Sequence, residues 1–141
     1  MFKKQIGLLT PLFFVLAFAG CWTPSAVFNQ RAYEQDVSLK VDALAIMDQA
    51  TSPYDSSYAD IQLLRKNLRK AYEYAKGLPN NENTVQQWEI LLDPKGDLLI
   101  AFLDEWKTKG TLKPGYIMIK EGLVSEGFDA IIGLESGKKK K

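Results

Sequence analysis

Apolar residues recur at helical spacing along most of the chain, most clearly between residues 57 and 77. There the apolar positions step by three and four: Ile61, Leu64, Leu68, Ala71 and Ala75. Such spacing gathers side chains on one face of an amphipathic helix. The tetrad Ser57-Tyr58-Ala59-Asp60 has the pattern of a capping box, and Gly77 followed by Pro79 marks a helix end. We therefore predict a helix that opens at this tetrad and stops at Gly77.

An earlier helix is predicted over residues 26–50, with Ser25 as its N-cap. Its apolar positions also step by four and three: Tyr33, Val37, Val41, Leu44 and Met47. This stripe predicts the face that packs on the core. Pro53 lies just beyond the end of the helix.

A third helical pattern covers residues 84–109 and is interrupted by Asp93-Pro94-Lys95-Gly96. One register continues across the interruption: Trp88, Leu92, Lys95, Leu99, Phe102 and Trp106. Two independent helices have no reason to share a phase, so we expect one helix that is bent at the proline. Gly110 follows as its C-terminal cap.

The last pattern starts at Pro114, a residue favoured in the first turn of a helix. Its apolar face contains Ile117, Val124, Phe128, Ile131 and Leu134. Residues 116–119 have strand-like composition, but a single strand would have no partner, so we predict helix.

Together these patterns predict an all-α fold, namely an up-down-up-down four-helix bundle whose third helix is kinked or broken at Asp93-Pro94. The bundle domain is expected to cover residues 26–136, and residues 137–141 to form a disordered Lys-rich tail.

The first 20 residues have a different character. Lys3 and Lys4 precede an apolar run from Ile6 to Ala19, which is the layout of a cleaved secretory signal peptide. A membrane-spanning helix needs roughly 20 apolar residues, and this run is shorter. We therefore assign residues 1–20 to a signal peptide.

The run ends in Ala17-Phe18-Ala19-Gly20-Cys21, which resembles the lipobox of bacterial lipoproteins, although that family prefers Leu where Phe18 stands. The resemblance implies that Cys21 carries lipid (palmitate among its acyl chains) and becomes the first mature residue. Residues 21–25 would then be a short lipidated tether. The alternative is ordinary secretion, because Ala17-Phe18-Ala19 also fits the general signal peptidase.

If Cys21 is lipidated, the protein is held at the cell envelope through its lipid anchor. An Asp just after the cysteine resembles a signal for retention in the inner membrane of Gram-negative bacteria, and Trp22 stands there instead. We expect the outer membrane, facing the periplasm, in a Gram-negative source, and otherwise the outer face of the cell membrane.

Composition excludes several chemistries. The 141 residues contain no histidine and one cysteine, which removes His-based triads, His-ligated zinc, disulfides and thiolate catalysis if Cys21 is blocked. Without the signal peptide and the last four lysines, the body has 12 basic and 17 acidic residues. Such an acidic body argues against nucleic-acid binding. We expect no enzyme activity, cofactor or metal.

Two groups of residues are candidate surfaces for a ligand or partner. The first is an aromatic cluster beside the expected kink: Trp88, Phe102, Trp106 and Tyr116. The simpler interpretation is that these rings fill the core. The second is basic: Arg65, Lys66, Arg69 and Lys70. It fits an anionic surface or an acidic partner, or else a solvated helix face paired with Asp60 and Glu73.

The tail Lys138-Lys139-Lys140-Lys141 is a further candidate for contact with an anionic surface, or simply a solvating chain end. The carboxylates Asp93, Asp97, Asp104 and Glu105 have no calcium-loop spacing, and Asp93 and Asp97 are expected to cap helices beside the kink.

Two functions fit these features. The first is a membrane-anchored, non-catalytic helical lipoprotein that acts as an interaction or accessory module with a protein partner at the cell envelope. The second is a binding protein for a small apolar or amphipathic ligand in a cavity near the kinked helix.

Overall fold

The computed structural model describes residues 26–138, and within that range every regular element is a helix. The elements are α1 (Gln30–Met47), η1 (Asp48–Thr51), η2 (Tyr54–Ser57), α2 (Tyr58–Gly77), α3 (Glu82–Leu92), α4 (Leu99–Lys109) and α5 (Pro114–Ser136). The prediction of an all-α fold is confirmed. Residues 1–25, with the expected signal peptide and tether, lie outside the described residues, as do Lys139–Lys141.

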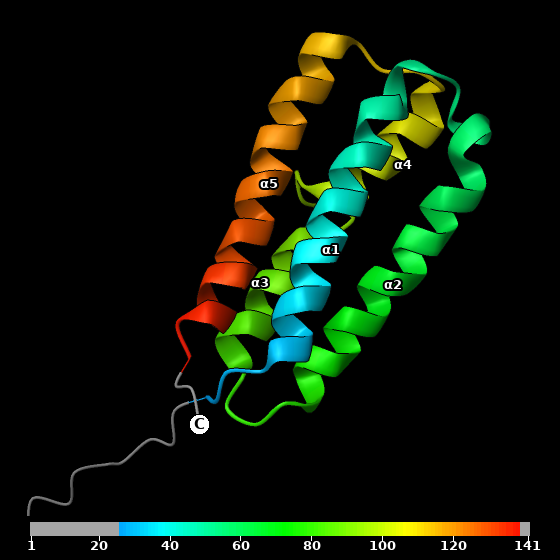
Figure 1. Cartoon of the computed structure of the whole chain (residues 1–141). Helices are drawn as coiled ribbons and strands as arrows, with labels where there is room; N and C mark the ends of the chain where they lie inside the picture. The colour runs from blue at the N-terminus through cyan, green and yellow to red at the C-terminus, as the bar shows by residue number, and fades with distance from the viewer. Residues whose placement is uncertain (1–25, 139–141) are drawn as a thin grey trace, which may run out of the picture.

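Figure 1 shows α1, α2 and α5 running along the length of the molecule, with α3 in its lower part and α4 in its upper part. The helix α1 packs against both α2 and α5, and α3 packs against α5. No helix within residues 26–138 has the length and apolar character needed to cross a membrane.

The predicted continuous third helix is wrong, because α3 ends at Leu92 and α4 begins at Leu99. The residue before a proline is pushed out of the helical conformation, and Asp93 has an extended backbone with φ −67° and ψ 116°. The Asp93 carboxylate accepts a hydrogen bond from the Lys95 amide at 2.9 Å, and the Asp93 carbonyl accepts one from the Gly96 amide at 3.1 Å. These bonds close a turn, so the chain breaks instead of bending.

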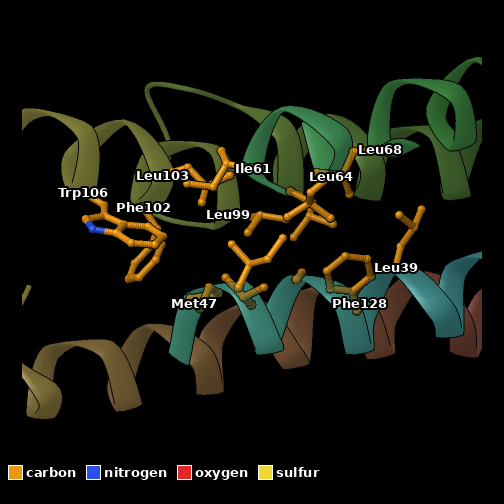
Figure 2. Packing of buried hydrophobic residues seen from close by; sticks show 14 of the residues in the cluster. Leu39, Met47, Ile61, Leu64, Leu68, Leu99, Phe102, Leu103, Trp106 and Phe128 are labelled. Atoms are coloured by element: carbon orange, nitrogen blue, oxygen red, sulfur yellow. The ribbon is translucent and has the colours of Figure 1, made fainter. Parts of the chain in front are cut away.

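The shared register across the break nevertheless had a physical cause. Both helices turn their apolar faces to one core, in which these residues are buried: Trp88, Leu91, Leu99, Phe102, Leu103 and Trp106. Figure 2 shows labelled side chains from α1, α2, α4 and α5 pointing into this core. Four residues of the predicted register are therefore buried, whereas Leu92 is partly buried and Lys95 is exposed.

The predicted face of α1 is right at Met47 but wrong at Val37 and Val41. Val37 and Val41 are exposed, at 37% and 62% of their surface, and Leu44 is only partly buried. The buried positions are Ala32, Asp36, Leu39, Ala43, Ile46 and Met47. A buried aspartate and two alanines made the true face look less apolar than its neighbour. The helix starts at Gln30 because the Asn29 side chain accepts the Ala32 amide at 3.0 Å.

Predictions for the other helices agree better with the structure. All five apolar positions of α2 are buried, and the helix ends at Gly77. Ser57 precedes α2 but is no capping residue, because its hydroxyl donates to Gln49 Oε1 at 2.7 Å. Pro114 opens α5, and residues 116–119 are helical. A Cβ on Gly127 would lie 3.2 Å from Leu91 Cδ1, so this glycine permits the close packing of α5 on α3.

Paired aspartate substitutions on α1 test the corrected face. Leu39→Asp should unfold the domain or cost several kcal/mol, because Leu39 is 3% exposed and a buried unpaired charge is expensive. Val41→Asp should change the unfolding free energy by only about 0.5 kcal/mol, as exposed substitutions usually do. Denaturant unfolding of both variants measures this difference. A larger loss for Val41→Asp would restore the face expected from the sequence.

Candidate functional site

The aromatic cluster lies in the packed core and not at a surface. Trp88 and Trp106 are 0% exposed, and Phe102 is 1% exposed. Trp88 packs edge-on against Phe128 with ring centroids 6.0 Å apart, and the Trp106 indole donates to the Ser52 carbonyl at 3.0 Å. Tyr116 stacks on Phe102 at 6.5 Å. These rings fill the space where the inward faces of α3 and α4 meet the other helices, as the simpler interpretation held.

A surface hollow does lie at the break between α3 and α4, but other residues line it. Two adjoining hollows, of about 650 and 480 Å³, share Tyr72, Leu92 and Pro94. We call the joined hollows the break groove. Its further apolar lining consists of Leu68, Ile90 and Ile100. The groove is open to solvent and lies between α2 and the turn at Asp93-Pro94.

The four basic residues of α2 line the continuation of this groove, and we call them the basic face: Arg65, Lys66, Arg69 and Lys70. Arg65 and Arg69 line both the break groove and the next hollow, of about 490 Å³, so apolar and basic linings join. Helical spacing produces this arrangement, because Arg65, Arg69 and Tyr72 follow one another at intervals of four and three on α2.

The basic face lacks the ion partners expected from the sequence. Glu73 pairs with Lys76 at 3.3 Å instead, and Asp60 forms no ion pair within residues 26–138. Arg65 binds Asp104 at 2.5 Å. In the same range Lys66, Arg69 and Lys70 take part in no ion pair, so three cations remain available on this face.

The four candidate carboxylates are dispersed among separate partners. Asp93 accepts the Lys95 amide, Asp104 binds Arg65, and Asp97 pairs with Lys120 and is not a helix cap. Glu105 accepts hydrogen bonds from Lys109 and Tyr116, which lower its pKa. Within residues 26–138, no group of three or more His, Cys, Asp or Glu residues could hold a metal ion.

A buried ionic cluster at the end of the molecule where Asn29 meets α5 was missed from the sequence. Asp36, Glu135 and Lys138 are 3%, 0% and about 8% exposed. Glu135 accepts the Asn29 amide at 2.7 Å and pairs with the Lys138 amine. Lys138 is thereby withdrawn from the anionic-surface contact expected of the tail. An aspartate among alanines on α1 was the one available signal.

A second carboxylate contact lies between the end of α1 and α5. Burial, followed by a hydrogen bond with Asp48, raises the pKa of Glu121 to about 6. Asp48 follows α1 directly and Glu121 lies in α5, so the pair bridges these helices.

No protein-family model, curated protein or solved structure matches this chain. The residues themselves therefore carry the functional argument.

The buried cluster predicts a pH-dependent stability. Burial, followed by the charge of Glu135, raises the pKa of Asp36 from its ordinary 3.8 to about 7, and Lys138 opposes the shift. The folded protein thus holds this proton more tightly than the unfolded chain does. The resulting stabilisation is full below pH 3.8 and is lost as the pH rises through about 7.

Asp36→Asn should remove this dependence. The difference in unfolding free energy between wild type and variant should decrease by on the order of 4 kcal/mol from pH 4 to pH 8. Asp42→Asn, at an exposed position on the same helix, is the control and should follow the wild-type curve. Parallel curves for wild type and Asp36→Asn would show that Asp36 does not titrate in this interval.

Proposed function

We propose that the protein is a membrane-anchored, non-catalytic helical lipoprotein that serves as an interaction or accessory module at the cell envelope. One structural observation carries the interaction role: an open apolar groove that continues into a basic face with three cations free of ion pairs. The signal-peptide pattern and the lipobox-like sequence at Cys21 support the anchor. The partner would be another envelope protein.

The arrangement of the chain ends supports this role. The Asn29 amide binds Glu135, so the first and last described residues lie at the same end of the molecule, as Figure 1 shows. Only residues 22–25 separate Cys21 from Ala26. A lipid on Cys21 would therefore hold the molecule by that end and leave the sides of the helices facing the envelope space. Lys139–Lys141 follow Lys138 in the sequence, and lysines near a membrane attract anionic lipid.

We further propose that the five helices act as a four-column, up-down-up-down bundle. In this interpretation α3 and α4 together form the third column, interrupted at Asp93-Pro94. The interruption matters for function because it opens the groove beside α2.

Binding of a small apolar or amphipathic ligand is the second candidate function. The break groove favours it in volume and apolar lining. Ligand sites usually enclose most of the ligand surface, however, and this groove is open along its length. A ligand retained by the native protein in mass spectrometry after gentle extraction would favour this second function.

Cys21→Ser tests the anchor. The variant should lose all incorporation of a fatty-acid analogue, because Cys21 is the only cysteine in the chain. A control places Ser25→Cys in the Cys21→Ser background and should not recover the label, since the lipobox-like residues precede position 21 only. Label on Cys21→Ser would exclude Cys21 as the acceptor.

Photo-crosslinking in intact cells tests the interaction role. A crosslinker at Gln62, beside the basic face, should give one defined protein adduct, and the same crosslinker at exposed Lys113 should not. Recovery of the free monomer alone from both positions would contradict the interaction role.

A further inference from the structure

The break groove combines two kinds of lining along one side of α2. At one end it is apolar, with Tyr72, Leu92 and Pro94 shared between its hollows. At the other end Arg65 and Arg69 carry it onto the basic face. An occupant that fits both ends must be amphipathic, with apolar groups at the break and negative charge beside the two arginines.

Charge is divided unevenly between the two ends, although the lining as a whole has four cations and four carboxylates. Each carboxylate already has a partner: Asp104 with Arg65, Glu73 with Lys76, Glu89 with the Tyr72 hydroxyl at 3.0 Å, and Asp93 with the Lys95 amide. Lys66, Arg69 and Lys70 have no ion pair within residues 26–138. Glu89 and Asp93 have neutral hydrogen-bond partners and keep their negative charges at the break. The charge available for an occupant is therefore positive at the basic face only, where Glu73 and Asp104 are already in ion pairs.

The shape of the groove selects the class of occupant. The break groove and the basic face together have a lining on α2 from Gln62 to Glu73, which corresponds to roughly 16 Å along a helix at 1.5 Å per residue. The groove is shallow and open, whereas a small ligand is normally enclosed. A peptide segment of about three turns, laid along α2 with its apolar side down, matches this length and shape.

We propose that the break groove and the basic face bind an acidic amphipathic segment of a partner protein. Apolar side chains of the segment contact Tyr72, Ile90 and Leu92, and its carboxylates meet Lys66, Arg69 and Lys70. This inference rests on the proposed interaction function and names its surface and the chemistry of its partner. Because such a contact is largely electrostatic at its rim, it weakens as salt concentration rises.

A designed peptide probe tests the proposal. The probe is a fluorescein-labelled helical 20-mer with leucines at i, i+3, i+4 and i+7 flanked by glutamates, titrated with the full-length protein as its native host produces it. We expect saturable binding, which Lys66→Glu/Arg69→Glu should weaken by about tenfold or more. Lys113→Glu makes the same kind of charge change at an exposed site outside the groove and should stay within about twofold.

Two further arms separate specific docking from general charge attraction. A probe with lysines in place of the glutamates should prefer the double variant over the wild type, which restores the charge match. Ile90→Ser, at an exposed apolar position in the groove, should also weaken the original probe several-fold. Circular dichroism melting confirms that each variant remains folded.

Several outcomes would overturn the proposal. These are no saturable binding, equal losses for Lys113→Glu and the double variant, or no effect of Ile90→Ser. Binding of anionic phospholipid vesicles that needs Lys66 and Arg69, while the peptide fails to bind, would assign the surface to a membrane instead. The peptide assay does not depend on acylation. Failure of the Cys21 labelling test would therefore overturn the proposed anchor, whereas the peptide assay alone decides whether the groove binds an acidic segment.

Discussion

The extended conformation that Pro94 imposes on Asp93 divides the middle of the chain into two helices, α3 and α4. A helix loses a hydrogen bond at proline, and the residue before proline avoids the helical region. Here Asp93 is extended. Its carboxylate accepts a hydrogen bond from the Lys95 amide, and its carbonyl accepts one from the Gly96 amide. Each of these bonds stabilises the turn against a continuous helix. The chain therefore enters α4 as a new helix, with both helices buried against the same core.

This break links packing to the candidate site. Trp88 and Trp106 stay in the core on either side of the break, so the interior is not opened. The opening is external, where Leu92, Pro94 and Ile100 face Tyr72 and Leu68 of α2. The same local constraint thus preserves the core and leaves a groove on the surface.

Sequence periodicity predicts the buried face of a helix well where the residues that pack in the core are also the most apolar ones. The positions of α2 such as Ile61, Leu64 and Leu68 are large, apolar and buried, so their pattern identified the face correctly. On α1 the two disagree. Ala32, Asp36 and Ala43 lie inside while Val37 and Val41 lie outside, and only the close packing of α1 with α2 and α5 accounts for alanines at the contact.

The same distinction applies to the candidate sites. The basic face could be predicted because helical spacing alone places Arg65 and Arg69 together. Its adjoining apolar lining could not, because the position of Leu92 and Pro94 beside α2 depends on a turn that hydrogen bonds from the Lys95 and Gly96 amides to Asp93 close. The ionic cluster of Asp36, Glu135 and Lys138 joins positions about a hundred residues apart, and no local pattern records such a contact.

The buried ionic cluster and the break groove consist of different residues, so stability and the proposed binding depend on different parts of the molecule. Buried charges gain little net stability over apolar residues, but removing one partner is costly because another charge is left unpaired. Lys138 supplies the positive charge that Glu135 and Asp36 face. The last described residue therefore helps to balance the buried negative charge beside α1. None of these residues lines the break groove or the basic face, whose positive charges belong to side chains of α2. Substitutions at exposed positions of the groove are therefore expected to leave the junction of the chain ends, and with it the fold, intact, so that the proposed binding can be tested apart from stability.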